Sequence, residues 1–273
     1  MNPLYLDTCV LPRSRLETAA LYRGEFGPGL GFELLPMFDL PDWEANLKRN
    51  LSFFAQGPLC FHEPVWGVEH TALPGSAAWE ESMYQLRKTK VYAEILRPRF
   101  MVYHLSNCVI PPQGREEMLR VSLENRERMR DFFPGVTLLT ENTGIRADGT
   151  LLLDQEEFTA LCLDRDMDVL IDVGHANANG WDLFRLVADL KGQIRAFHLH
   201  NNDGIHDLHN RLENGTIDFR KLIPFIARTV PDADLVVEYT RPEYHGDPLC
   251  EDVAYLQDLL RKSNEPRGSH GQQ

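Results

Sequence analysis

The amino-acid sequence predicts one α/β domain, a single (β/α)8 TIM barrel, from three observations. Eight short apolar runs alternate with amphipathic helical stretches, which is the order of a parallel sheet whose strands are linked by helices. The chain has 273 residues, and such barrels have about 250. Several apolar runs end in His, Asp or Glu, as expected of strands that carry polar residues to the carboxyl-terminal face of a barrel.

The expected strands are runs of aliphatic, β-branched and aromatic residues bounded by polar or turn-forming residues. They cover residues 4–9, 31–35, 59–61, 100–104, 136–141, 168–172, 194–198 and 235–239. The carboxyl ends of all strands in a barrel meet at one face. The polar residues that close these runs should therefore lie near one another.

Start signals place several of the helices between the strands. Ser14 to Glu17 has the pattern of a capping box, Pro41 opens a helix that runs through Asn50, and acidic residues from Asp154 mark another start. Further helices are expected at 77–96, 115–133, 182–190, 219–227 and 252–261. The barrel is thus predicted to span residues 1–261, and the polar, aperiodic residues 262–273 are predicted to form a disordered tail.

Charge and composition narrow the possible partners and compartments. The formal net charge is −13, whereas duplex binding draws on clustered Lys and Arg, so nucleic acid is a disfavoured partner. No apolar run approaches the roughly 18 residues that predict a membrane span. The amino-terminal residues lack the regions of a signal peptide, and the five cysteines form no CxxC pair. A reduced, cytoplasmic setting is therefore expected, while the oligomeric state stays open.

Histidines and carboxylates at the strand ends predict a metal site. Zinc takes imidazole nitrogen and carboxylate oxygen, and a catalytic zinc site keeps a position for water or substrate. Asp172 and His175 stand three residues apart at a strand end, and Asp207 and His209 share one side of an extended segment. A single histidine at a strand end is more often a hydrogen-bonded core residue. Because the pattern recurs around one rim, we interpret it as metal-binding.

Four motifs carry a family resemblance, and they cover the second half of the barrel best. They are Leu139-Thr140-Glu141-Asn142-Thr143-Gly144, Ile171-Asp172-Val173-Gly174-His175-Ala176, His198-Leu199-His200-Asn201-Asn202-Asp203 and Asp207-Leu208-His209. They resemble the motifs of the xylose isomerase-like TIM barrel superfamily, also described as AP endonuclease family 2. Within that superfamily they are most similar to the endonuclease IV branch.

The resemblance implies three divalent ions, zinc first, with manganese, iron or magnesium as alternatives. One ion would be held by His62 and His104, and Glu141 would bridge it to a second ion. The ligands of the second ion would be completed by Asp172, His198 and Glu238, and those of the third would be His175, Asp207 and His209.

A single-metal reading uses fewer of these residues. Sugar isomerases and epimerases of the same superfamily hold one ion with two glutamates, an aspartate and a histidine, which match Glu141, Asp172, His198 and Glu238 here. In that reading Glu141 and Glu238 are also the acid and base. It leaves unexplained His62, His104 and the pair of Asp207 and His209.

The expected activity is metal-dependent hydrolysis of a phosphoester bond in a small sugar-phosphate or nucleotide-like molecule, with Glu141 and Glu238 as catalytic residues. The superfamily includes a hydrolase that cuts the nucleotide loop of cobamides, and no motif here selects or rejects that substrate. The alternatives are a sugar or sugar-phosphate isomerase or epimerase, an abasic-site endonuclease and a non-enzymatic metal-binding scaffold. Against the endonuclease, Asn201 stands where an acidic residue is common in the family.

Three further residues are candidates for substrate binding. His200 shares the face of His198 and is expected to orient substrate or a ligand, and Arg241 follows the last strand, where barrels often bind phosphate. Glu33 is expected to bond backbone at the rim, with substrate contact as the alternative.

The loop 63–75 is expected either to cover substrate or to pack on the surface. His70, His206 and His245 are expected to be ordinary loop histidines, and neither Cys9 nor Cys108 is expected to be a nucleophile.

Overall fold

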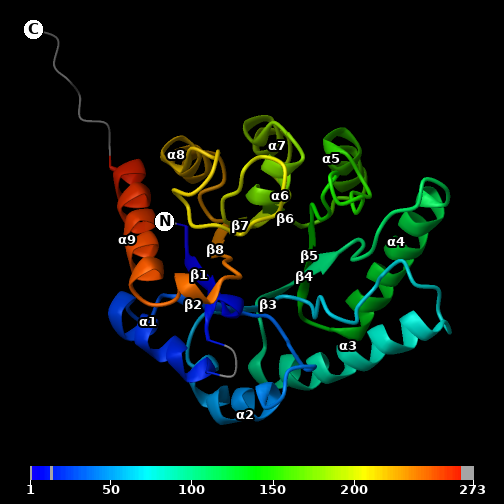
Figure 1. Cartoon of the computed structure of the whole chain (residues 1–273), viewed down its shortest axis with the longest axis horizontal. Helices are drawn as coiled ribbons and strands as arrows, with labels where there is room; N and C mark the ends of the chain where they lie inside the picture. Colours follow the sequence, from blue (N-terminus) through cyan, green and yellow to red (C-terminus); the bar gives the residue numbers. More distant parts are fainter. Residues whose placement is uncertain (1, 13–14, 266–273) are drawn as a thin grey trace, which may run out of the picture.

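The computed structural model describes residues 2–12 and 15–265, and it confirms the predicted barrel. Eight parallel strands follow one another in sequence order, and the last pairs with the first to close the sheet. Figure 1 shows these strands at the centre of the molecule with the helices around them. The strands are β1 (Leu4–Asp7), β2 (Gly31–Leu34), β3 (Leu59–Phe61), β4 (Phe100–His104), β5 (Thr137–Glu141), β6 (Val169–Asp172), β7 (Ile194–Leu199) and β8 (Asp234–Val237).

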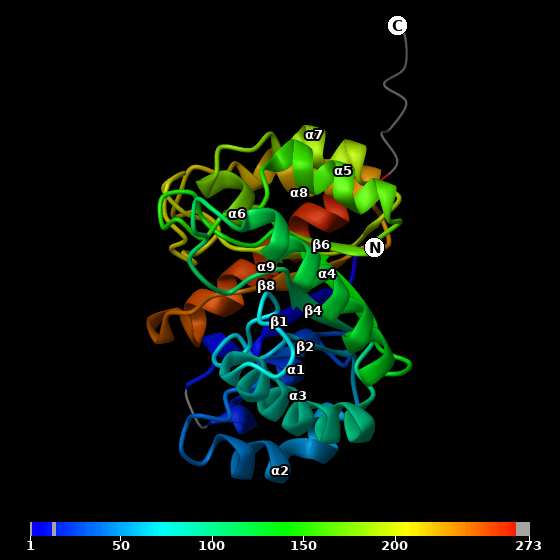
Figure 2. The same ribbon diagram turned by 90° about the vertical axis from the view of Figure 1, so that its right-hand side faces the viewer.

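The helices form the outer layer. In Figure 2, α5, α7 and α8 lie on one side of the barrel and α1, α2 and α3 on the other. The α-helices are α1 (Ala19–Phe26), α2 (Trp43–Phe54), α3 (Ala77–Leu96), α4 (Arg115–Phe132), α5 (Gln155–Asp164), α6 (Val173–Ala178), α7 (Leu183–Asp189), α8 (Phe219–Thr229) and α9 (Asp247–Asn264). Short 3-10 turns occur at η1 (Thr8–Val10), η2 (Leu16–Thr18) and η3 (Pro242–Tyr244). No helix in the described ranges is long and apolar enough to cross a membrane.

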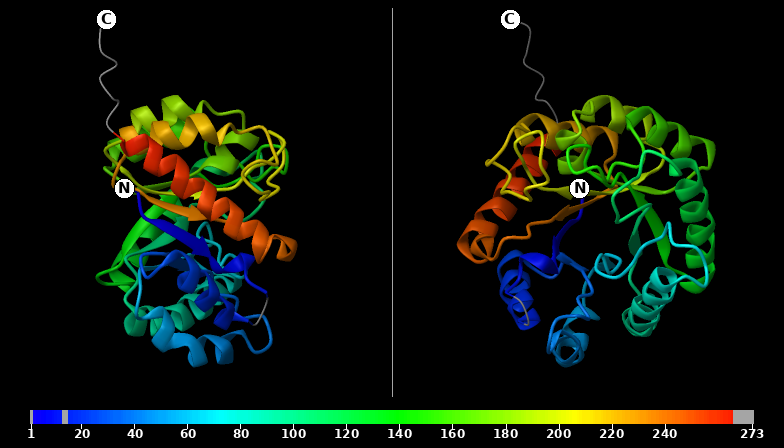
Figure 3. Two further views of the ribbon diagram at one scale, coloured as in Figure 1. Left: turned by 90° about the vertical axis from the view of Figure 1, so that its left-hand side faces the viewer. Right: turned by 45° about the vertical axis from the view of Figure 1, so that its right-hand side comes forward.

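The last helix, α9, closes the outer layer. It packs against α8, and its first turn lies beside α1, where the Cys250 thiol donates to Glu25 (Figure 3). Its apolar face is fully buried at Leu249, Val253 and Leu256. This burial explains why α9 begins before the expected residue 252 and continues to Asn264, past the expected boundary at 261. Residues 266–273 of the predicted tail lie outside the described residues.

Two other differences concern helix starts. The helix expected from the pattern Ser14 to Glu17 begins only at Ala19, after the 3-10 turn Leu16–Thr18 and without a side-chain cap. The capping box itself involves Ser14, which lies outside the described residues. The helix α6 was not expected. Asp172 caps it, since its Oδ1 atom accepts a hydrogen bond of 2.6 Å from the backbone N–H of His175. That cap turns the chain immediately after β6 and sets His175 beside the strand end.

A plug of buried side chains fills the barrel interior, and it positions the residues above it. Its members are Tyr5, Cys60, Phe100, Val102, Leu139, Leu170, Ala196 and Val236. Successive strand residues point to opposite faces, so the residue two positions after an inward side chain also points inward. Two positions after the last plug residue, each of the seven strands that contribute to the plug therefore has an inward polar residue. These residues are Asp7, His62, His104, Glu141, Asp172, His198 and Glu238. Predicted ligands therefore converge because the strands share one alternation.

Candidate metal centre

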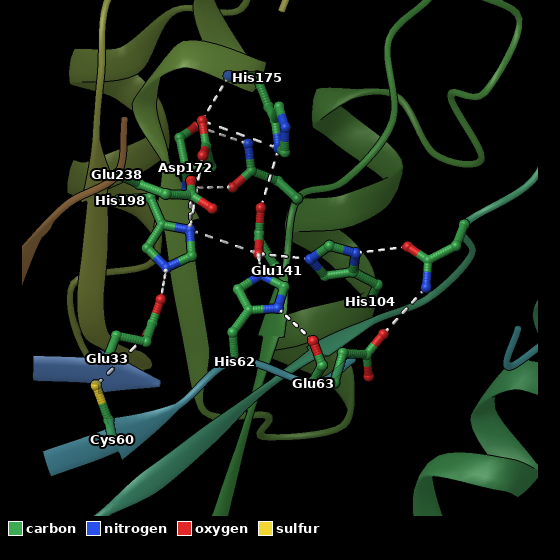
Figure 4. A network of polar contacts seen from close by, with 12 residues as sticks. Glu33, Cys60, His62, Glu63, His104, Glu141, Asp172, His175, His198 and Glu238 are labelled. Carbon is green, nitrogen blue, oxygen red and sulfur yellow. Dashed lines mark hydrogen bonds and ion pairs between the residues drawn. The ribbon is translucent and has the colours of Figure 1, made fainter. Parts of the chain in front are cut away.

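The polar layer above the plug contains a histidine whose inner nitrogen lies close to three carboxylates. His198 Nδ1 lies 3.2 Å from Glu238 Oε2, 3.7 Å from Glu141 Oε2 and 3.7 Å from Asp172 Oδ2. It is buried and makes no hydrogen bond within the described part of the chain. One donor atom from each of Asp172, His198 and Glu238 lies within 4.8 Å of the others (Figure 4). An orphaned nitrogen among carboxylates fits a position for a cation.

Glu141 joins this group to three further imidazoles. Its Oε2 atom lies 3.0 Å from His104 Nε2 and 3.8 Å from His62 Nε2, while its Oε1 atom lies 3.0 Å from His175 Nδ1. The rings of His62 and His104 meet edge to face, with 4.8 Å between their centroids. The two oxygens of one buried carboxylate thus face different histidines. Because Oε2 also lies 3.7 Å from His198 Nδ1, Glu141 is shared between neighbouring groups of ligands.

A second group lies nearer the cavity, on α6 and the loop after β7. Asp207 Oδ2 lies 3.0 Å from His209 Nε2 and 3.3 Å from His175 Nε2, and Asp207 Oδ1 is buried without a hydrogen bond among the described residues. His209 has φ of 45°, a left-handed conformation that is uncommon for a side-chain-bearing residue and clusters at functional sites. His200 completes this group, with donor atoms within 4.8 Å.

The charges of the centre are mutually compensating. Burial lowers the pKa of the His104 and His209 imidazoles, but carboxylates outweigh it: Glu141 raises the pKa of His104 to about 9, and Glu238 with Asp207 raises that of His209 to about 10. Burial likewise raises the pKa of Glu141, yet the surrounding imidazoles hold it well below its usual range. Protons thus supply, in the ion-free protein, positive charge that divalent ions can supply when bound.

The outer nitrogens of the imidazoles are fixed by other groups. Glu33 Oε1 lies 2.9 Å from His198 Nε2, the Glu63 backbone oxygen lies 2.7 Å from His62 Nδ1, and Asn107 Oδ1 lies 2.6 Å from His104 Nδ1. Such partners orient ligating histidines and set their tautomers. The structure does not place Glu33 at the rim as expected. Its carboxylate is fully buried and contacts His198 and Cys60, and contact with substrate stays a prediction.

His70 is not the ordinary loop histidine that was expected. It is buried and belongs to the hydrogen-bonded residues behind the ligand histidines. It is 3% exposed, and its Nε2 atom lies 2.7 Å from Glu63 Oε2. Glu63 Oε1 in turn accepts from Asn107 Nδ2 at 3.2 Å, and Asn107 contacts His104. The signal that could have found the pair is Glu63 itself, a carboxylate directly after the predicted ligand His62. The other two loop histidines contact Asp203 and Tyr22 as ordinary polar partners.

His200 lies under the second group and not on the substrate side. It is completely buried, its Nε2 atom lies 3.0 Å from Asp172 Oδ2, and its ring stacks on that of His209 with 4.0 Å between centroids. Gly174 makes this position possible, because a Cβ atom there would lie 1.9 Å from His200 Cε1. His200 can therefore orient ligands or join them, whereas direct substrate contact does not fit its burial.

A cavity of about 610 Å³ opens above the centre. The lining includes His62, His104, Glu141, His175, Asp207, His209 and Glu238. The loop 63–75 contributes Val65 and Trp66 to its wall, in keeping with the substrate-covering alternative. Arg241 is exposed and outside the lining, so its phosphate contact stays a prediction. Cys9 lines the cavity, but burial and Asp7 raise the pKa of its thiol well above the usual range, which disfavours a nucleophile.

No protein-family model matches the chain, and no curated protein matches it in sequence. Solved structures do match in fold. A D-tagatose 3-epimerase-like protein has a TM-score of 0.77 at 17% identity, over 96% of this chain and 98% of that one. The IolI protein with a bound zinc atom has a TM-score of 0.73 at 15% identity, over 97% and 100%. Endonuclease IV from Thermus thermophilus has a TM-score of 0.63 at 18% identity, over 96% and 98%.

These likenesses establish the fold. The chain shares the closed (β/α)8 barrel of these structures, which include both epimerases and endonucleases. The donor atoms gathered at the strand ends fit divalent metal ions, with zinc suited to imidazole and carboxylate ligands.

Proposed function

We propose that the protein is a metal-dependent hydrolase that cleaves a phosphoester bond in a small sugar-phosphate or nucleotide-like molecule. The observation that carries this proposal is the second ligand group. His175, Asp207 and His209 stand beside the first group, with Asp207 Oδ1 buried and unpaired among the described residues. A single-metal isomerase has no use for this group, whereas phosphoester hydrolases commonly clamp the attacking and leaving oxygens between ions.

The predicted ligands form separate groups, and each group would hold a different ion. Asp172, His198 and Glu238 would hold one ion. Glu141 would link it to an ion at His62 and His104, which both face its Oε2 atom, and the second ligand group would hold another. When bound, divalent ions supply Lewis-acid activation of a water molecule and of a phosphoryl oxygen.

The two glutamates have different roles in this proposal. Glu238 is 7% exposed and lines the cavity, so its carboxylate is placed to accept the proton of the attacking water. Glu141 is 1% exposed and its oxygens face His62, His104 and His175, so it stays ionised and holds the centre together. Both carboxylates orient the reacting water between them and the substrate.

The second candidate is a sugar isomerase or epimerase. It is favoured by the compactness of the group around His198 Nδ1, whose carboxylates can serve as both ligands and proton carriers. The fold match to a D-tagatose 3-epimerase-like protein is in keeping with it.

Activity measurements on His209→Ala separate the two candidates. Zinc- and manganese-loaded protein is assayed with bis(4-nitrophenyl) phosphate and with D-tagatose. His206→Ala is the matched control, since this exposed histidine of the same loop bonds Asp203. Hydrolysis that falls at least about tenfold in His209→Ala, and not in the control, supports the proposal. Epimerisation that survives His209→Ala, with no diester hydrolysis by either protein, overturns it in favour of the epimerase.

A further inference from the structure

We infer that the cavity seats an apolar ring of the substrate against one wall, so that the substrate is a singly charged phosphodiester carrying such a group. This inference rests on the proposed function and adds a substrate class to it. The apolar wall consists of Leu35, Met37, Leu40, Val65 and Trp66. The same cavity is lined by His62, Glu141 and Glu238. A group that binds the apolar wall therefore belongs to the same molecule as the phosphoester bond that is cleaved.

The apolar wall is built from two loops at the carboxyl ends of β2 and β3. Leu35 is 5% exposed and forms its floor, while Trp66 is 54% exposed and stands at its rim. A large exposed indole beside a concave site gains free energy when a ligand covers it, and aromatic side chains contribute rigid contact area. The cavity volume of about 610 Å³ is within the range of sites that enclose small organic ligands.

The charge of the lining favours a diester over a monoester. Among the described residues the lining contains no Lys or Arg, and outside the centre it adds the carboxylates of Asp39 and Asp148. Sites for phosphate dianions use such cations in bidentate contacts. A phosphodiester carries one negative charge and a phosphomonoester carries two. The diester therefore requires less positive charge from the metal centre. The lining also includes the hydroxyl of Thr143, which can contact the polar part of the substrate.

The test compares substrates with one leaving group. Benzyl 4-nitrophenyl phosphate and methyl 4-nitrophenyl phosphate differ only in the retained group, and 4-nitrophenyl phosphate is the monoester. We expect kcat/KM for the benzyl diester to exceed that for the methyl diester at least about tenfold, and both to exceed that of the monoester. Equal rates for the two diesters, or a faster monoester, would overturn the inference.

Two variants test whether the preference for the benzyl diester depends on the apolar wall. Trp66→Ala should lower kcat/KM for the benzyl diester much more than that for the methyl diester, so that most of the preference for benzyl is lost. Leu73→Ala is the control, because Leu73 is also 54% exposed and lies on the same loop but outside the lining. Equal losses on both diesters in Trp66→Ala, or the same change in Leu73→Ala, would contradict the assignment.

Calorimetric binding of dibenzyl phosphate and dimethyl phosphate provides a readout without turnover. Tighter binding of dibenzyl phosphate that depends on Trp66 supports the apolar wall even if no diester is hydrolysed, in which case the proposed hydrolysis alone fails. Hydrolysis of both diesters with no difference in binding leaves the hydrolase standing and removes the apolar subsite.

Discussion

His198 directs its Nδ1 atom toward Glu238, whose Oε2 atom lies 3.2 Å away, yet no hydrogen bond joins them. The opposite nitrogen of the same ring is firmly held, because Nε2 lies 2.9 Å from Glu33 Oε1. A buried imidazole is thus fixed on its outer side and unpaired on its inner side. This asymmetry is what a metal ligand with an orienting partner shows.

The first prediction tests that orienting partner. Glu33→Gln keeps the size of the side chain but removes the negative charge behind His198, so the affinity of the centre for zinc should fall by about 10- to 100-fold. Competition with a chromophoric chelator measures the change. Glu243→Gln, at an exposed position on η3, is the control and should keep the original affinity. Unchanged zinc affinity in Glu33→Gln would show that the contact with His198 does not tune the ligand.

The second prediction concerns the close approach of His200 to α6. In Gly174→Ala the added methyl group would lie 1.9 Å from His200 Cε1, so the ring must move away from Asp172 and His209. We expect a loss of about 1–3 kcal/mol in unfolding free energy, together with weaker ion binding. Denaturant titration and metal analysis check both effects.

A matched glycine provides the control for that variant. Gly24 lies in α1 with no atom within 4 Å of an added Cβ, so Gly24→Ala should stabilise the protein by about 0.5–1 kcal/mol. If Gly174→Ala were as well tolerated as Gly24→Ala, the position assigned to His200 would be wrong.

The third prediction is that ion binding releases protons. The pKa of His104 is raised to about 9 and that of His209 to about 10, so both imidazoles are protonated at pH 7 in the ion-free protein. A ligand histidine must be neutral, and therefore binding displaces these protons and tightens as pH rises toward 9. Each proton released makes the apparent affinity rise by roughly tenfold per pH unit. Calorimetry in two buffers of different ionisation enthalpy counts the protons, and pH-independent binding without release would oppose the prediction.

The fourth prediction concerns nucleic acid. With a net charge of −13, undamaged duplex DNA should bind more weakly than a micromolar dissociation constant at physiological salt. An abasic-site duplex should be cleaved slowly in comparison with small phosphodiesters, because extrusion of a nucleotide needs specific contacts. Fluorescence anisotropy and gel assays measure these properties. Rapid, site-specific incision by catalytic amounts of the protein would restore the endonuclease alternative.

The barrel and its polar layer were predictable because one rule generates both. Plug residues such as Leu139 and Ala196 are followed two positions later by Glu141 and His198, so inward alternation is visible in the sequence. Helix boundaries set by long-range packing were less predictable. The burial of Val253 against the barrel, for example, depends on where α9 docks and not on its own sequence.

The supporting residues of the centre were the least predictable part. Glu33 and His198 are distant in sequence, and only strand pairing around the closed barrel brings them together. His70 belongs to a loop without periodicity, and its place follows from stacking on Tyr103 at 4.1 Å between centroids and bonding to Glu63. Contacts of this kind cannot be predicted from the spacing of residues in the sequence.

The most direct test of the central claim is the number of metal ions per chain. Protein purified without chelator, and again after reconstitution with excess zinc or manganese, is analysed by elemental mass spectrometry alongside His209→Ala and His206→Ala. We predict two or three ions per chain, one fewer in His209→Ala, and no change in His206→Ala, because His209 contacts Asp207 whereas His206 contacts Asp203. A single ion in the original protein, unchanged by reconstitution and by His209→Ala, would contradict it.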